Sequence, residues 1–281
     1  MSVLTINKLT DTVGAEVVGV DPAQLGSDDG LGQAVLNALE ENGVLVFHGL
    51  NLSAEDQVAF CERLGEVDRS ADGRHPVSGI YPITLDKAKN KAADYLRASY
   101  IWHIDGCTPT SDECPQKATV LSALEVAAQG GETAFASAYD AYDSLPDAEK
   151  KRYESLRVVH SLEASQRRVT PDPTDEQLTR WRARPTSEHP LVWTHRNGRK
   201  SLVLGASADY VVGMDLDEGR ALLTELLDHA TSAEKVYQHS WSVGDTVIWD
   251  NQGVLHRAMP HEPDSPREML RTTVLGDEPI Q

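Results

Sequence analysis

From residue 116 onward, most apolar segments of the chain are too short to form a helix of ordinary length. They are rich in β-branched and aromatic residues and are separated by turn-forming residues, which is typical of β-strands. The predicted strands are KATVLSAL, ETAFAS, LRVVHSL, LVWTH, SLVLG, KVYQHSW, DTVIWD and LRTTVLG. The pair 191–195 and 200–204 flanks Asn197-Gly198, a strong hairpin-turn signal. Many short strands with few helices predict a mainly β fold with flanking helices, namely a double-stranded β-helix (jelly roll, cupin-like).

The first 65 residues mix strands with helices. Apolar residues at helical spacing predict a helix over 31–42 that stops at Gly43. A second helix is expected within 53–65, where Ser53 can cap the N-terminus. The other predicted elements are two strands within 2–19, a strand at 44–48, and two helices near 146–156 and 217–230. The leucines of the last helix form one apolar stripe, which indicates core packing.

The length of 281 residues, without internal repeats or a low-complexity linker, is consistent with one domain over 1–281. Residues 68–100 are polar and rich in Asp, Lys, Gly and Pro. This segment is predicted to be a long irregular loop. Because long ordered loops of compact domains are often functional, we interpret 68–100 as an active-site lid that shapes the substrate pocket.

Charge and cysteine content restrict the possible partners. The net charge of −18 opposes binding to nucleic acid or to an anionic membrane surface, but an anionic small molecule can still bind to buried arginines. The three cysteines, Cys61, Cys107 and Cys114, form no CxxC motif and are interpreted as packing residues of a reducing compartment. The sequence shows neither an apolar signal core nor an apolar run of membrane-spanning length, so we expect a cytoplasmic protein.

The stretch IWHIDG places His103 and Asp105 two residues apart. On a strand these two side chains share a face and could bind one cation, although a single His-x-Asp is expected by chance in a chain with ten histidines. A second segment, 245–260, predicts a strand, a turn and a short strand that holds His256. Two imidazoles and one carboxylate form the facial triad of non-haem Fe(II) enzymes, but the same residues could bind zinc.

Two arginines follow His256. Arg267 and Arg271 lie four residues apart in a segment predicted to be a strand, so their side chains share a face. The arginine guanidinium binds carboxylates in a bidentate manner, and burial strengthens the pairing. Two inward-pointing arginines in an acidic protein therefore indicate that anionic groups bind near the metal.

The ordered motifs WHID, GGETAFAS, WDNQGVLHRA and REMLRTT resemble the taurine dioxygenase / aryloxyalkanoate dioxygenase family of Fe(II)- and 2-oxoglutarate-dependent oxygenases. The resemblance covers nearly the whole chain and includes GAEVVGVD and LNALEENGVLVFHGL. The resemblance implies that His103, Asp105 and His256 are the iron ligands. It also implies that Thr133 and Arg267 bind the distal carboxylate of 2-oxoglutarate.

The resemblance assigns the remaining site residues less directly. Arg271 matches an arginine that faces the substrate anion or the cosubstrate, whereas Trp102 and Trp249 match flanking aromatic residues that we interpret as packing. Ser99 stands where several relatives have a substrate-contacting Asn, Gln252 stands where Arg is common, and His75 aligns weakly with a substrate-contacting His. These positions put the identity of the substrate in question, not the iron centre. The substrate residues implied by the resemblance are Arg271, Ser99 and His75.

The resemblance implies a dioxygenase that uses Fe(II), 2-oxoglutarate and O2 and releases succinate and CO2. Its substrate is expected to be a small or medium organic anion, such as a carboxylate or sulfonate, which is hydroxylated with or without cleavage of a C–O or C–S bond. The alternatives are a metal-dependent hydrolase on the same ligands and a non-catalytic jelly-roll binding protein. The choice between a monomer, a homodimer and a higher homo-oligomer is left open by the sequence.

Overall fold

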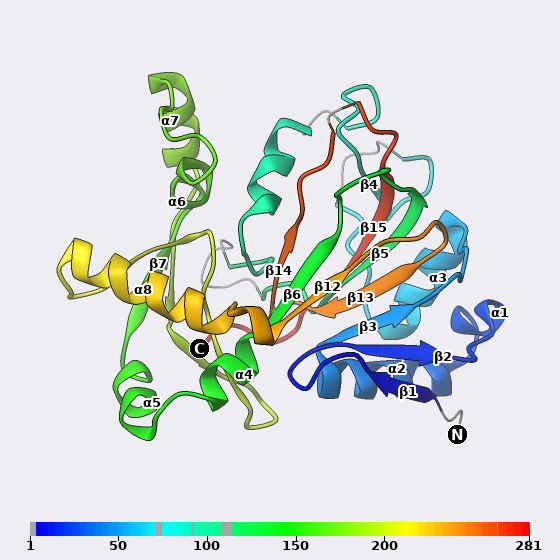
Figure 1. Ribbon diagram of the computed structural model, residues 1–281, viewed down its shortest axis with the longest axis horizontal. Coiled ribbons are helices and arrows are strands. Elements are labelled where there is room, and N and C mark those ends of the chain that lie inside the picture. Colours follow the sequence, from blue (N-terminus) through cyan, green and yellow to red (C-terminus); the bar gives the residue numbers. More distant parts are fainter. Residues whose placement is uncertain (1–3, 71–74, 91–92, 108–113, 263) are drawn as a thin grey trace.

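The computed structural model describes residues 4–70, 75–90, 93–107, 114–262 and 264–281 (Figure 1). Its centre is a pair of β-sheets. The large sheet contains, in spatial order, β1 (Thr5–Lys8), β2 (Ala15–Val18), β3 (Val44–Phe47), β13 (Thr246–Asp250), β5 (Ala118–Glu125), β15 (Glu268–Val274) and β4 (Tyr81–Ile83). The small sheet contains β12 (Val236–His239), β6 (Thr133–Ser137) and β14 (Val254–Ala258). All neighbours in these sheets are antiparallel except β2 and β3, which are parallel.

The two sheets pack face to face over an apolar core. Phe135 of β6 contacts the Trp249 ring of β13 at 5.6 Å between centroids, and both side chains are buried. The core between the sheets also includes Val247, Val254 and Met269. This packing confirms the predicted mainly β, sandwiched architecture, with helices on its outside.

Three helices cover the outer face of the large sheet (Figure 1). They are α1 (Pro22–Leu25), α2 (Asp29–Asn42) and α3 (Ala54–Leu64). The predicted signals hold locally, because the Ser53 hydroxyl accepts a hydrogen bond from the backbone N–H of Asp56, and Gly43 adopts a φ of 71° at the end of α2. The two longer helices of this region, α2 and α3, were thus predictable from their caps and from the spacing of their apolar residues.

The region between β6 and β12 contains more elements than the sequence predicts. Its helices are α4 (Ala138–Asp143), α5 (Asp147–Tyr153), α6 (Leu162–Arg167), α7 (Asp175–Arg182), α8 (Leu216–Ala230) and the 3₁₀ helix η2 (Ala233–Lys235). Its strands are β7 (Arg157–His160), β8 (Ser187–Pro190), β9 (Val192–Thr194), β10 (Lys200–Leu202) and β11 (Ala208–Val211). The expectation of only two helices is wrong here, since α4, α6 and α7 are too short to show a clear helical period.

Two predictions for this region are confirmed. β9 and β10 form an antiparallel hairpin around Asn197-Gly198, where Gly198 has a φ of 85°. Leu222, Leu223 and Leu226 of α8 are buried in the core, as the apolar stripe indicates.

Within the described part of 68–100, the structure adds two short elements to the irregular segment that the sequence predicts. Residues 81–83 form β4, which pairs with β15 at the edge of the large sheet, and residues 93–100 form the 3₁₀ helix η1 (Ala93–Tyr100). Lys89 forms an ion pair with Glu268 of β15. The sequence concealed β4 because it is three residues long and contains a proline, which edge strands tolerate.

Cys61, Cys107 and Cys114 are all free thiols, and the first two are buried. Among the described residues, no helix is both long and apolar enough to span a membrane.

Asp250, at the end of β13, is expected to make the stability of the protein depend on pH. The side chain is 7% exposed and accepts hydrogen bonds from the Tyr139 hydroxyl and the Gln252 N–H, at 3.1 and 2.9 Å. Burial raises the pKa of Asp250 from 3.8 to about 6 despite these bonds. The folded state then binds the proton more tightly than the unfolded state, so the free energy of unfolding falls as pH rises from about 4 to about 6, by about 3 kcal/mol.

Urea unfolding of wild type and Asp250→Asn at several pH values checks this sign. We expect the difference in unfolding free energy between the two proteins to shift in favour of Asp250→Asn as pH rises through that window. A difference that is constant with pH would contradict the raised pKa.

Candidate metal centre

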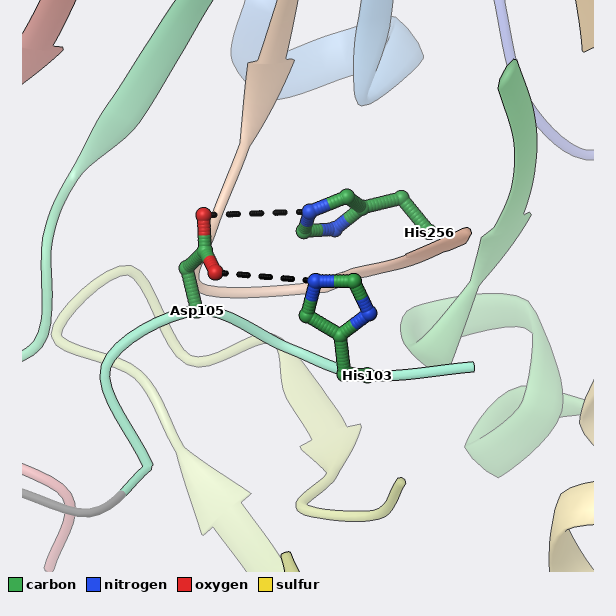
Figure 2. Close-up of side chains that lie close together, drawn as sticks. All are labelled: His103, Asp105 and His256. Carbon is green, nitrogen blue, oxygen red and sulfur yellow. Dashed lines mark ion pairs between the residues drawn. The ribbon is translucent and has the colours of Figure 1, made fainter. Parts of the chain in front are cut away.

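His103, Asp105 and His256 lie close together, with their ring nitrogens and carboxylate oxygens facing one another (Figure 2). One ligand atom from each side chain can be chosen so that all lie within 4.8 Å of one another. The Nε2 atoms of His103 and His256 are each 3.7 Å from an oxygen of Asp105. Among the described residues, this is the one group of three or more potential ligands with such spacing.

Backbone contacts on two sides hold the His103 segment in place. On one side, His103 and His256 exchange both backbone hydrogen bonds, at 3.1 and 2.9 Å. On the other side, the N–H of Ala206 donates to the Trp102 carbonyl at 2.8 Å, and Gly205 lies directly against the His103 backbone. The segment therefore forms a single bridge and not a strand, because Asp105 lies in a turn.

Hydrogen bonding and burial prepare both imidazoles for metal binding. The Nδ1 of His103 lies 2.8 Å from the Ile101 carbonyl, so it must carry the proton, which leaves the lone pair on Nε2. Burial and the neighbouring His103 lower the pKa of His256 to about 3, which keeps that ring neutral. Burial opposes ionisation of Asp105, but Arg271 and the two imidazoles outweigh it and hold its pKa below the usual range. Two imidazole nitrogens and one carboxylate fit Fe(II) and other divalent ions of the first transition row.

A cavity of about 110 Å³ lies beside the three ligands. Its walls are mostly apolar. They come from both sheets, from η1 and from the segment that precedes η1. The lining residues are Ile83, Thr84, Leu85, Leu96, Ser99, Tyr100, His103, Asp105, Leu121, Thr133, Trp249, His256, Ala258, His261, Arg267 and Arg271. The sequence-predicted Thr133, Arg267 and Arg271 therefore share one cavity with the ligand group.

Arg267 is a buried cation without a partner carboxylate among the described residues. Its side chain is 5% exposed, and its Nε donates only to the carbonyl of Gly131, at 3.2 Å. Burial lowers the pKa of Arg267 to about 10. A buried unpaired charge is unfavourable, so an anion bound in the cavity would relieve this penalty.

Gly131 provides the space for Arg267. A Cβ at Gly131 would lie 2.9 Å from the Arg267 Nε, and the residue has a φ of 78° that favours glycine. Gly130 is restricted in the same way, because a Cβ there would lie 2.2 Å from the Pro260 carbonyl oxygen. Both glycines of GGET are thus required by close contacts.

The comparison with known proteins gives one consistent result. A model of the Taurine catabolism dioxygenase TauD, TfdA family matches residues 5–273. The chain belongs to this family. The match confirms the predicted family, and the family's enzymes are Fe(II)- and 2-oxoglutarate-dependent dioxygenases.

Relatives with named activities are similar over most of their length. The chain is 36% identical to the Alpha-ketoglutarate-dependent 2,4-dichlorophenoxyacetate dioxygenase of Cupriavidus pinatubonensis, over 85% of this chain and 86% of that one. It is 30% identical to the Alpha-ketoglutarate-dependent sulfate ester dioxygenase of Pseudomonas putida, over 99% and 91%. The crystal structure of AAD-2 in complex with Mn(II) and N-oxalylglycine superimposes with a TM-score of 0.83 at 32% identity, over 100% of both chains.

These findings make this TauD/TfdA-family protein an oxidoreductase that uses Fe(II), 2-oxoglutarate and O2. The likeness to AAD-2 over the whole chain confirms the predicted jelly-roll fold class. The comparisons therefore favour the dioxygenase over the metal-dependent hydrolase and the non-catalytic binding protein.

The other predicted residues of this family member lie at different distances from the cavity. Ser99 lines it, and its hydroxyl donates to the Leu96 carbonyl at 2.6 Å. His75 does not line it, and its Nδ1 instead accepts from the Val77 N–H. Gln252 lies in the turn before β14 and does not line the cavity. Trp249 lines the cavity, whereas Trp102 packs beneath the Arg257 guanidinium at 4.7 Å.

Four further histidines make their contacts elsewhere in the fold. Buried His239 and half-exposed His48 flank the Asp245 carboxylate, at 3.3 and 3.1 Å. His160 and His195 contact serine hydroxyls within the core. Sequence reasoning missed Gly205, Gly131 and the cavity-lining His261; of these, only the paired glycines of GGET gave a signal.

Proposed function

We propose that the protein oxidises a small organic anion at Fe(II) bound by His103, Asp105 and His256. The observation that carries this proposal is the shared cavity: three ligand atoms within 4.8 Å of one another lie beside the unpaired cation Arg267. Three protein ligands leave three coordination positions open for cosubstrate and O2. When bound, Fe(II) and 2-oxoglutarate reduce O2 and supply the oxidising power for insertion of oxygen into a C–H bond, with release of succinate and CO2.

In this proposal the protein side chains have two roles: some orient a metal ligand, and others balance the negative charge of a carboxylate. The His103 Nδ1–H remains on the Ile101 carbonyl, so the ring orientation is fixed before the metal binds. Arg271 donates to Asp105 at 2.7 Å and to the Gln116 side chain at 3.0 Å, which fixes the carboxylate that faces the metal. Arg267 and the Thr133 hydroxyl bind the distal carboxylate of 2-oxoglutarate.

We infer that the substrate combines one anionic group with an apolar body. Arg271 lines the cavity and carries the positive charge nearest the ligands, whereas Leu85, Leu96 and Leu121 provide apolar walls. The named relatives act on aryloxyalkanoates and sulfate esters, which combine the same two features. Ser99 contributes a polar contact to the substrate in this proposal; His75 does so only if its segment moves toward the cavity.

We further propose that the described residues of 84–90 and 93–100 form the outer wall of the substrate pocket within a single domain of residues 1–281. Thr84, Leu96 and Tyr100 contribute to the lining. The pairing of β4 with β15 and the Lys89–Glu268 ion pair anchor this wall to the sheet. Such anchoring favours a preformed wall over a long flexible loop.

Succinate release tests the substrate proposal. The Fe(II)-loaded protein with 2-oxoglutarate and O2 is given aryloxy acids, sulfonates, sulfate esters and amino-acid derivatives, each beside a neutral ester or amide of the same body. We expect at least one anion to accelerate succinate release and its neutral partner to have little effect. Equal acceleration by the neutral partners would contradict recognition through Arg271.

Replacement of Arg267 tests the cosubstrate site. Arg267→Met keeps the aliphatic bulk and removes the charge, so we expect 2-oxoglutarate to bind about 30-fold more weakly or worse. Arg267→Lys keeps the charge without the bidentate fork, so its affinity for 2-oxoglutarate should lie between those of wild type and Arg267→Met. Without 2-oxoglutarate, Arg267→Met should unfold at no lower urea concentration than wild type, because it removes an unpaired buried cation. Calorimetric titration and urea unfolding measure the two effects.

A further inference from the structure

The Thr133 hydroxyl is in contact with a residue that does not line the cavity. The indole N–H of Trp241 donates to its Oγ1 at 3.0 Å. Thr133 lines the cavity and is 4% exposed, whereas Trp241 is not among the lining residues. Trp241 therefore contacts the cavity only through Thr133.

This contact restricts where the threonine proton can point. An indole nitrogen is a donor only, so the Thr133 oxygen must be the acceptor in this bond. The single hydroxyl proton then stays available for another acceptor, and accepting one hydrogen bond strengthens the donation of the next. A carboxylate in the cavity is such an acceptor, and hydrogen bonds to charged groups are the strong ones.

Packing around Trp241 holds its indole in this position. The His239 ring meets the Trp241 ring edge-on, at 4.6 Å between centroids and 88° between planes. Asp245, 2% exposed at its side chain, accepts from the Ser242 N–H at 3.0 Å and lies 3.3 Å from the His239 Nε2. A buried carboxylate thus holds the connection between β12 and β13 that contains Trp241.

We propose that Trp241 is a positioning residue that orients the Thr133 hydroxyl as a donor to the distal carboxylate of 2-oxoglutarate. This inference rests on the proposed function, in which Thr133 and Arg267 bind that carboxylate. Trp241 acts through Thr133 and touches neither the metal ligands nor the substrate.

Calorimetric titration of the Mn(II)-loaded protein tests the proposal without turnover. The ligands are 2-oxoglutarate and 2-oxopentanoate, in which a methyl group replaces the distal carboxylate. Wild type, Trp241→Phe, Thr133→Val and the double variant are compared. Trp181→Phe, at a buried tryptophan of α7, is the matched control.

Trp241→Phe should weaken 2-oxoglutarate binding about fivefold to tenfold and leave 2-oxopentanoate binding unchanged. In the Thr133→Val background the same substitution should have little further effect, and Trp181→Phe should have none. Equal weakening of both ligands, or an undiminished effect in the Thr133→Val background, would overturn the proposal. Undiminished binding by Trp241→Phe would also overturn it and leave the proposed function intact. Failure of wild type to bind 2-oxoglutarate would instead overturn the proposed function and this inference with it.

Discussion

Replacement of His256 with alanine is expected to abolish both Fe(II) binding and succinate formation. The variant retains two of the three ligands that lie within 4.8 Å of one another. Changes to residues that merely support metal ligands cost about 10- to 100-fold in affinity, so loss of a ligand itself should cost at least about 100-fold. Anaerobic equilibrium dialysis with Fe(II) measures the affinity, and succinate release measures turnover.

His261→Ala is the matched control for this experiment. His261 lines the same cavity, but its Nδ1 contacts the Glu262 carbonyl and it lies outside the ligand group. We expect His261→Ala to bind Fe(II) as wild type does. Retention of wild-type Fe(II) affinity by His256→Ala, or equal loss by both variants, would show that His256 is not a ligand.

Gly205→Ala is expected to displace His103 and so to weaken Fe(II) binding, although Gly205 is not itself a metal ligand. A Cβ at Gly205 would lie 2.8 Å from the His103 Cα and 3.0 Å from the Trp102 oxygen, and these backbone atoms cannot rotate away. The φ of 113° adds strain for any residue with a side chain. We expect Fe(II) affinity to fall about 10- to 100-fold, as for other residues that orient ligands.

Gly198→Ala separates this clash from backbone strain. Gly198 has a similar positive φ of 85° in the β9–β10 hairpin, but a Cβ there would meet nothing within 4 Å. It should cost about 1 kcal/mol of stability and leave Fe(II) affinity unchanged. If the two variants bind Fe(II) equally well, Gly205 does not set the position of His103.

The central strands of the sandwich were predictable because each carries a run of β-branched or aromatic residues between turn signals. β6 and β13 lie within predicted segments, and β5 and β15 overlap theirs, with β5 one residue longer at its end and β15 beginning two residues earlier. α4, α6 and α7 were not predicted, since elements of 6 to 8 residues show barely two helical turns. β4 was concealed because its place in the sheet depends on pairing with β15, far along the chain.

The sequence predicted which side chains form the candidate site, but not the backbone contacts that position them. Spacing and residue type pointed to His103, Asp105 and His256, yet the two-residue spacing does not come from a strand, because 101–106 forms a single bridge followed by a turn. What holds this turn is Gly205, about one hundred residues away, and no local pattern marks such a contact. The same holds for Trp241, whose bond to Thr133 joins residues 108 positions apart.

Anaerobic addition of Fe(II) and 2-oxoglutarate to the protein tests most directly whether the three ligands and Arg267 form one site. We predict a visible charge-transfer band from 2-oxoglutarate chelated to the metal, weakened in Arg267→Met and absent in His256→Ala. Folded wild-type protein that shows no band, or a band that survives in His256→Ala, would contradict the assignment of this site.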